Sequence, residues 1–338
     1  MKLLEAVPNL SDGSNPYLKA KILKRLLGIE SLWVLGVEPH FDAKRTVITL
    51  VGTGKSLLEG LFALYQVAAL EIDMRSYQSI HPHIGAVDLC PIIPLGKVTK
   101  QDAQELVQTL AKLVWEELKI PVFFYHNCAT DNSRIKLSSL RKGNYVGLEK
   151  RIAEGFAPDL GDSVNVKSGA TILGQREFLI AFNINLKGAT LEDAKYIASV
   201  LRKQRKGSKM ESVEFIGWYL EEFKMSQVSC NLRNYQEFGL EEVYSAVDVE
   251  ARKLGIYVSG SELIGLAPLK ALLPSHSLGL RRETKGEPKR SDLTIDPNLK
   301  VEITRKVKML GLEELGPFDI WTKILELRLQ ALGGPYEI

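Results

Sequence analysis

The chain has 338 residues, of which 45% are hydrophobic and 25% charged, and its 44 basic and 41 acidic side chains give a formal net charge of +3. These ordinary globular values exclude wholesale disorder. The near balance of charges argues against a dedicated nucleic-acid-binding protein, which needs a broad positive field. A chain of this length is expected to form two domains and a tail.

The sequence also predicts a cytoplasmic protein with no membrane partner. No stretch approaches the ~18 uninterrupted apolar residues of a membrane helix, and the apolar run at the N-terminus is too short for a signal peptide. Cys90, Cys128 and Cys230 are odd in number and far apart. We interpret them as reduced thiols, mostly buried, in a reducing compartment.

The N-terminal part of the chain alternates between short β-branched runs and longer helical patterns. Strands are expected at residues 2–7, 31–38, 45–51, 86–93 and 121–125. Helices are expected at residues 15–27, 56–72 and 101–118, where apolar side chains recur at helical spacing.

The same order of elements follows in the second half. Strands are expected at residues 178–186, 212–220, 226–232 and 256–259, with helices at 191–205 and 240–254. Strand–helix–strand–strand–helix–strand is the order of a ferredoxin-like unit. A doubly wound sheet is less natural because two connections in each half are too short for a crossover helix. We therefore predict an α+β fold with two ferredoxin-like (βαββαβ) subdomains, antiparallel sheets and a C-terminal helical tail.

The predicted division is an N-terminal subdomain (1–176), a C-terminal subdomain (177–274) and a linker with a helical tail (275–338). Residues 141–174 are rich in Gly, Ser and Asp, and we expect a loop and functional rim there. The basic and acidic residues of 278–297 predict a solvated linker, with nucleic-acid contact as the less favoured alternative. Helical periodicity returns at 300–332.

A His-Pro-His segment, His81 to His83, lies between a helix end and a strand. Pro82 restrains the backbone before it and Gly85 permits an unusual angle, so the His81 ring would be held on a stiff support. An imidazole with a pKa near neutrality can act as an acid–base group. A helix cap or a local hydrogen bond is the alternative. We expect no metal, because no cysteine or acidic cluster with metal-site spacing stands nearby.

A second candidate is the loop between two glycines at residues 161–169. Such loops expose backbone groups that can recognise a flat heterocycle, and a lysine in the loop could meet a carboxylate. It lacks the spacing of a phosphate-binding loop. Its residues are Gly161, Asp162, Ser163, Val164, Asn165, Val166, Lys167, Ser168 and Gly169.

Arg45, at the start of an apolar strand, is a candidate carboxylate clamp because a guanidinium group pairs with both carboxylate oxygens. Glu38, on the preceding strand, could be its partner or could contact an ammonium-like group of a substrate. A surface charge on an edge strand is the alternative for Arg45.

Taken together, the segments resemble the formiminotransferase domain family. One matching segment is the motif His81-Pro82-x-x-Gly85-Ala86-x-Asp88, and the ordered coverage of all the segments is more specific than any single motif. The others, in chain order, are residues 5–13, 45–47, 51–52, 72–74, 121–125, 158–161, 178–186, 216–220, 227–232 and 260–272.

The resemblance implies transfer of a formimino group from N-formimidoyl-L-glutamate to tetrahydrofolate, a step of histidine degradation. It places the catalytic acid–base on His81 and the folate-contacting loop on residues 161–169. It also implies ferredoxin-like subdomains and a homodimer. Arg45, Glu38 and His83 become candidate substrate-binding residues, tetrahydrofolate is the acceptor co-substrate, and no metal is needed.

The chain departs from the family pattern at four positions. Ile80 and His83 stand where the family usually has an acidic residue and an arginine, on either side of the His-Pro pair. Glu38 replaces an aspartate and Tyr77 a histidine. Two alternatives therefore stay open: a transferase with a different formimino or formyl donor, and a non-catalytic folate-binding or regulatory homologue.

Overall fold

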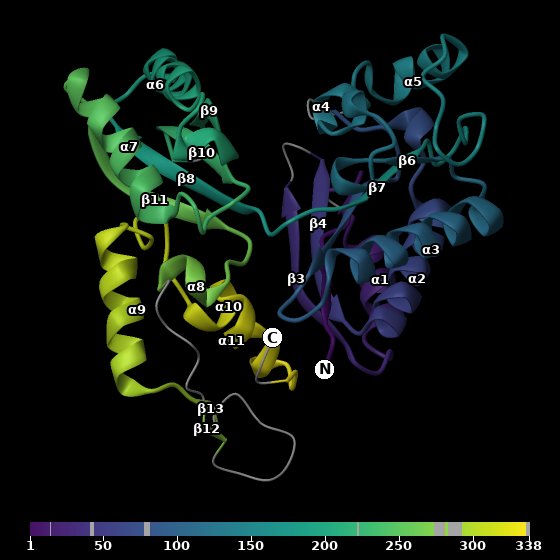
Figure 1. Cartoon of the computed structure of the whole chain (residues 1–338), viewed down its shortest axis with the longest axis horizontal. Coiled ribbons are helices and arrows are strands. Elements are labelled where there is room, and N and C mark those ends of the chain that lie inside the picture. The colour runs from purple at the N-terminus through teal and green to yellow at the C-terminus, as the bar shows by residue number, and fades with distance from the viewer. Residues whose placement is uncertain are drawn as a thin grey trace. The chain divides into compact units, whose positions relative to one another are not determined.

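The computed structural model describes residues 1–13, 15–40, 44–77, 82–221, 223–273, 281–282 and 293–335. The chain forms two compact units, which divide between Arg176 and Glu177. Each unit has a sheet of its own with helices (Figure 1), and the mixed α and β fold that the sequence predicts is confirmed. None of the described helices is long and apolar enough to cross a membrane.

The sheet of the first unit is mixed rather than antiparallel throughout, which corrects the prediction. Its strands run in the order β1-β4-β2-β5-β7-β6, with β3 paired to β4. The pairs β5–β7 and β6–β7 are parallel, because the chain crosses between these strands through helical segments that bring it back in the same direction. The bounds are β1 (Leu4–Ala6), β2 (Asn9–Leu10), β3 (Leu32–His40), β4 (Arg45–Gly52), β5 (Val87–Pro94), β6 (Val122–Phe124) and β7 (Thr171–Gln175).

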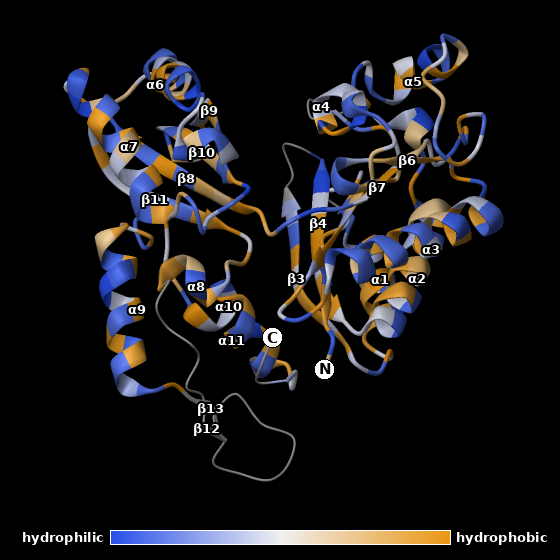
Figure 2. Cartoon of the chain, in the orientation of Figure 1, coloured by the Kyte–Doolittle hydropathy of each residue, from blue (hydrophilic) through white to orange (hydrophobic). Residues whose placement is uncertain are grey.

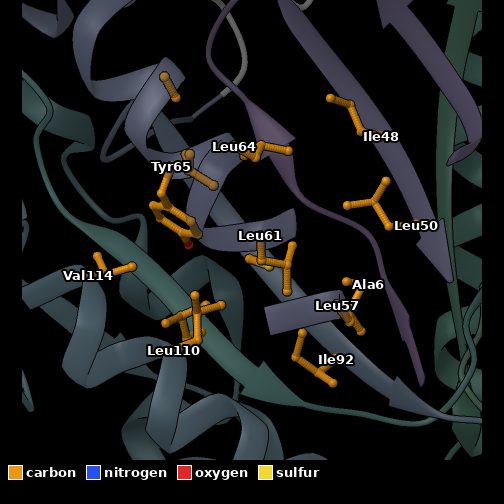
Figure 3. Packing of buried hydrophobic residues seen from close by; sticks show 14 of the residues in the cluster. Ala6, Ile48, Leu50, Leu57, Leu61, Leu64, Tyr65, Ile92, Leu110 and Val114 are labelled. Atoms are coloured by element: carbon orange, nitrogen blue, oxygen red, sulfur yellow. The ribbon is translucent and has the colours of Figure 1, made fainter. Parts of the chain in front are cut away.

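Three amphipathic helices form the core of this unit with the sheet: α1 (Pro16–Leu26), α2 (Gly54–Glu71) and α3 (Lys100–Leu118). Figure 3 shows Leu61 and Tyr65 of α2 among buried side chains of α3 and of the strands. The Thr99 hydroxyl and the Asp102 carboxylate form a reciprocal capping box at the start of α3. The apolar spacing explains why the sequence was sufficient to predict these helices, and the capping box fixes the start of α3.

Residues 141–174 do not form the expected continuous loop. They contain α5 (Asn144–Ala153) and most of β7, and α4 (Leu137–Leu140) immediately precedes them. The apolar residues Leu148 and Ile152 lie one helical turn apart and join a small core with Phe123 and Ile172. The glycine-rich composition obscured this pattern.

The second unit has a four-stranded antiparallel sheet in the order β11-β8-β10-β9. Residues Ile180, Phe182, Ile184 and Leu186 alternate along β8 and enter the core with α6 and α7. Figure 2 shows both hydrophobic and hydrophilic residues along this strand, as expected when one face is buried in the core. The bounds are β8 (Ile180–Lys187), α6 (Leu191–Gln204), β9 (Val213–Leu220), β10 (Met225–Leu232), α7 (Leu240–Lys253) and β11 (Tyr257–Ile264).

The C-terminal helices belong to this second unit. Leu299, Ile303 and Val307 of α9 lie in the same core cluster as the sheet. The bounds are α8 (Leu269–Leu272), α9 (Pro297–Met309), α10 (Ile320–Lys323) and α11 (Leu325–Ala331). Two short strands, β12 (Arg281–Arg282) and β13 (Leu293–Thr294), pair with each other. The rest of the basic segment predicted to be a linker, residues 278–280 and 283–292, lies outside the described residues.

Candidate active site

His81 lies outside the described residues. The residues that follow it, from Pro82 onward, are described and form the candidate site. The turn after Pro82 is fixed by a buried carboxylate. The Ile84 N–H donates to Asp88 Oδ1 at 2.8 Å, and Arg141 Nε donates to Asp88 Oδ2 at 2.9 Å. The Asp88 side chain is fully buried. A buried carboxylate with these donors gives the turn a rigid base.

The same turn runs directly beside the end of the loop at residues 161–169, which we call the glycine loop. Gly85 and Gly169 form a β-bridge. The Ala86 N–H donates to the Ser168 carbonyl at 2.8 Å, and the Ala170 N–H donates to the Ile84 carbonyl at 2.9 Å. The bonded residues of the two segments are 82 to 86 positions apart in the chain, so segments that are distant in the sequence are neighbours in space.

The side-chain amide of Asn165 stabilises the conformation of the glycine loop. Asn165 Oδ1 accepts the N–H groups of Lys167 and Ser168 at 3.1 and 2.8 Å, and its Nδ2 donates to the Lys119 carbonyl at 3.2 Å. Gly161 has a φ of +92°, where a side chain would be strained. Ser168 and Gly169 are buried, whereas Asp162, Ser163 and Val166 are exposed.

Lys167 binds the glycine loop to the segment at the end of α2. Its Nζ donates to the Leu70 carbonyl at 2.6 Å, close to the C-terminal end of α2, where the helix dipole favours a cation. Its carbonyl accepts the Met74 N–H at 2.8 Å. In this conformation the ammonium group is bound at a helix end; that it meets a ligand carboxylate, as the sequence suggested, stays a prediction.

Tyr145 of α5 connects the two segments. Its N–H donates to the His83 carbonyl at 2.7 Å, and its hydroxyl donates to the Val166 carbonyl at 2.5 Å. The sequence did not indicate Tyr145, because its surroundings were assigned to a loop. Its spacing of three residues from buried Leu148 was the available signal.

His83 is enclosed, with 2% of its surface exposed. Its Nδ1 lies 2.9 Å from Ser11 Oγ, and its Nε2 lies 3.4 Å from the Tyr77 hydroxyl. The rings of Tyr77 and His83 meet edge to face, with centroids 5.2 Å apart. This geometry therefore does not favour direct contact between His83 and a substrate.

Arg45 and Glu38 belong to the same group of charges. Burial lowers the pKa of Arg45, and Arg141 adds to that, whereas Asp88, Tyr77 and Glu38 oppose it. Strand β4 is paired on both sides, with β3 and with β1 and β2. Arg45 is therefore not a surface charge on an edge strand.

The sequence matches two family models. Residues 3–176 match the formiminotransferase domain, N-terminal subdomain, and residues 181–330 match the formiminotransferase domain. The chain belongs to the formiminotransferase domain family. The resemblance drawn from the sequence is thereby confirmed.

Relatives of known name extend this family assignment. The chain is 36% identical to glutamate formimidoyltransferase of Streptococcus pyogenes serotype M1, over 80% of this chain and 91% of that protein. It is 36% identical to glutamate formimidoyltransferase of Thermoplasma acidophilum, over 81% of this chain and 90% of that protein. It is 37% identical to formimidoyltransferase-cyclodeaminase of Rattus norvegicus over 96% of this chain. The chain spans only 59% of that longer formiminotransferase protein.

Within the described part of this chain, no group of three or more His, Cys, Asp or Glu side chains could hold a metal ion. Cys90 and Cys230 are buried free thiols, and Cys128 is half-buried. Burial raises the pKa of all three thiols. None has the lowered pKa of a reactive nucleophile.

Proposed function

We propose that this chain is a glutamate formimidoyltransferase. It transfers the formimino group of N-formimidoyl-L-glutamate to tetrahydrofolate and gives 5-formimidoyltetrahydrofolate and L-glutamate, a step of histidine degradation. Two relatives with this name are similar to the chain along at least 90% of their length. The structural observation that carries the proposal is the β-bridge between Gly85 and Gly169, which brings the His-Pro-His turn beside the glycine loop.

We propose His81 as the catalytic acid–base. His81 would accept the proton of the pterin N5 as the new bond from N5 to the formimino carbon forms, and would return it to the glutamate nitrogen as the old carbon–nitrogen bond breaks. One imidazole can serve both steps because the unperturbed pKa of a histidine side chain lies near neutrality. The remaining task of the site is to hold the two reactants in line.

The other site residues bind and orient in this proposal. The exposed part of the loop 161–169 faces the folate, and Arg45 binds a carboxylate of the glutamate donor with Glu38 beside it. Support for Arg45 comes from its half-buried position among the charges of Asp88 and Arg141. His83 acts by holding the turn, since its ring is enclosed.

The finer description of the fold is part of the same proposal. We describe both units as ferredoxin-like, with the helices after β11 as a tail. The order β11-β8-β10-β9 supports this for the second unit, because the strand order is the ferredoxin-like 4-1-3-2. We also propose that the protein is cytoplasmic and works as a homodimer.

The decisive experiment measures formimino transfer and tetrahydrofolate binding for His81→Asn. Turnover is expected to fall about 10²- to 10⁴-fold while the Kd for tetrahydrofolate changes little. His126→Asn is the matched control, because His126 is half-buried in the same unit, after β6. Its turnover should be that of the wild type. Full activity of His81→Asn removes this histidine from the mechanism.

The same assay on the wild-type chain separates the alternatives. Binding of tetrahydrofolate without turnover of any donor favours a non-catalytic homologue. Turnover with N-formyl-L-glutamate but not with N-formimidoyl-L-glutamate favours a different donor. Neither outcome is expected under the proposal.

A further inference from the structure

One face of the sheet in the second unit carries buried side-chain amides. Residues of β8 alternate, so Ile184 enters the core with α6 and α7, whereas Asn183 and Asn185 lie on the opposite face. Asn183 is 1% exposed and Asn185 is 0% exposed. Buried polar groups are nearly always hydrogen-bonded. The partners of these two amides therefore indicate what this face of the sheet does.

Asn185 is hydrogen-bonded on both sides by other side chains. Its Oδ1 accepts from Gln227 Nε2 at 2.7 Å, and its Nδ2 donates to Glu314 Oε2 at 2.9 Å. Gln227 Oε1 in turn accepts from Trp218 Nε1 at 2.8 Å. This row of side chains supplies its own partners and needs no ligand.

Asn183, two positions earlier on the same face, is different. Its Nδ2 is buried and has no hydrogen-bond partner in the part of the chain that the structure describes. Asn183 pairs with Ser229 of β10 on one side and with Glu262 of β11 on the other. Directly opposed residues point to the same face, with Cβ atoms about 5 Å apart. A hydrogen-bond donor without a partner therefore lies beside the half-buried carboxylate of Glu262.

The missing partner has to match this pair of groups. A ligand carboxylate would accept from Asn183 but would be repelled by Glu262. The amidinium form of a formimino group would suit Glu262 but has no acceptor for Asn183. The 2-amino-4-oxopyrimidine edge of a pterin has an oxygen acceptor followed by two N–H donors. A carboxylate can accept two parallel N–H bonds, so this edge matches both side chains.

We propose that Asn183 and Glu262 recognise the pyrimidine edge of the pterin in tetrahydrofolate. Asn183 Nδ2 donates to the 4-oxo oxygen, and the Glu262 carboxylate accepts N3–H and the 2-amino group. The inference rests on the proposed function, because tetrahydrofolate is the reactant of that reaction with such an edge. Guanine has the same edge, so guanosine monophosphate is the second ligand to be tested.

The first test measures the Kd of the full chain for tetrahydrofolate. Glu262→Gln removes the charge that strengthens two bonds, so its Kd should rise about 10- to 100-fold. Glu214→Gln is the matched control, because Glu214 of β9 has a side chain 49% exposed in the same sheet, 3.9 Å from Arg233. Its Kd should equal that of the wild type. An unchanged Kd in Glu262→Gln overturns the inference.

Asn183→Leu separates ligand recognition from a structural role. It removes a buried donor that has no partner, so its midpoint of urea unfolding without ligand should equal or exceed that of the wild type. Its Kd for tetrahydrofolate should rise about 3- to 10-fold. Its preference for tetrahydrofolate over tetrahydroaminopterin, which has a 4-amino donor in place of the oxygen, should fall by a similar factor. A lower midpoint with an unchanged Kd shows a structural residue and overturns the inference.

If Asn183→Leu does not fold, Asn183→Asp takes its place, because aspartate has nearly the same shape without the donor. The same weakening of tetrahydrofolate binding is expected, and an unchanged Kd contradicts the role of Asn183.

Two further outcomes separate this inference from its alternatives. Binding of guanosine monophosphate that Glu262→Gln abolishes, without binding of tetrahydrofolate, assigns the site to guanine and contradicts the pterin. Tetrahydrofolate binding with the expected losses in both variants, but without formimino transfer, contradicts the proposed function and leaves the recognition of the pterin in place. Formimino transfer with a wild-type Kd in both variants has the opposite meaning.

Discussion

Gly85 and Gly169 lie backbone against backbone at the junction of the His-Pro-His turn and the glycine loop. A Cβ atom added to Gly85 would lie 1.9 Å from the Ala170 carbonyl oxygen. One added to Gly169 would lie 2.2 Å from the Ile84 carbonyl oxygen, and Gly169 also has a φ of +72°. Neither position can take a side chain while the bridge is intact. The two glycines therefore bring the two candidate segments of the site together.

We expect Gly85→Ala to open this bridge. The collision is with backbone atoms, which cannot turn away as a side chain end can, so unfolding in urea should show a loss of about 2–4 kcal/mol. Tetrahydrofolate binding should weaken in the folded variant, because residues 161–169 lose their support at Gly169.

Gly147→Ala is the matched control for this substitution. Gly147 lies in α5 of the same unit, and a Cβ added there meets no atom within 4 Å. Alanine is the better helix former, so this variant should be unchanged or more stable by about 0.5–1 kcal/mol. Equal losses in the two variants would contradict a tight bridge at Gly85.

Local patterns in the sequence were enough to predict most elements of the fold. Apolar spacing in α2 and α3 and alternation in β8 follow directly from which faces are buried. The motif at residues 81–88 and the glycines at 161 and 169 also stand out in the sequence itself. These features depend on neighbours within a few positions.

The remaining features depend on contacts between distant residues. The ion pair of Arg141 with Asp88 spans 53 positions, and the bond between Ser11 and His83 spans 72. No local pattern marks either pair. The parallel pairing of β7 with β5 and β6 likewise depends on where the intervening helices pack. The glycine-rich composition predicted a loop where α5 forms, because the apolar face of a short helix is a weaker signal than several glycines.

Asp88→Asn should be strongly destabilising. The carboxylate is fully buried, and the Arg141 side chain has only 12% of its surface exposed. Removing one charge leaves the guanidinium buried without its counter-charge, which typically costs about 3–5 kcal/mol. Chemical denaturation at pH 7 measures the loss.

The surface pair of Lys150 and Glu154 provides the comparison. Its side chains are 80% and 62% exposed, at a spacing of four residues in the helical segment that contains α5. Glu154→Gln should change stability by at most about 1 kcal/mol. A small loss in Asp88→Asn, similar to this control, would show that the turn does not depend on the buried pair.

The three cysteines should differ in reactivity. Cys90 and Cys230 are fully buried, and burial raises the pKa of both thiols. Because the thiolate is the reactive form, neither should be alkylated by iodoacetamide in the native protein at pH 8. Cys128 is half-buried and should react slowly.

Mass spectrometry of the alkylated peptides measures this order directly. Cys128→Ser should remove the labelling of the native protein, and all remaining thiols should react after denaturation. Rapid labelling of Cys90 in the folded state would contradict its burial under α2 and α3.

Glu326 should make the second unit less stable as the pH rises. Burial raises the pKa of this carboxyl, although it accepts the Leu269 N–H at 2.8 Å. The folded state therefore binds the proton more tightly than the unfolded chain, whose glutamates titrate at about 4.3. The stabilisation is complete below that unfolded pKa and is lost as the pH rises through the higher folded pKa. Glu326→Gln keeps an acceptor for Leu269 and should be more stable than the wild type at pH 8, with a smaller difference at pH 4.

Asp102 should show the opposite dependence, which makes it the internal control. Its bonds with Thr99 in the capping box, and its pairing with Lys2, lower the pKa of this carboxyl to about 2. Its stabilisation is present above the unfolded pKa of about 3.9 and is lost as the pH falls toward 2. Asp102→Asn should therefore be less stable than the wild type at pH 7, and the two should converge in acid. Urea unfolding of the wild type and both variants from pH 3 to 8 measures how the free energy of unfolding of each depends on pH. If Glu326→Gln loses stability at pH 8 as Asp102→Asn does, the carboxylate of Glu326 is stabilised by its partners and not opposed by its burial.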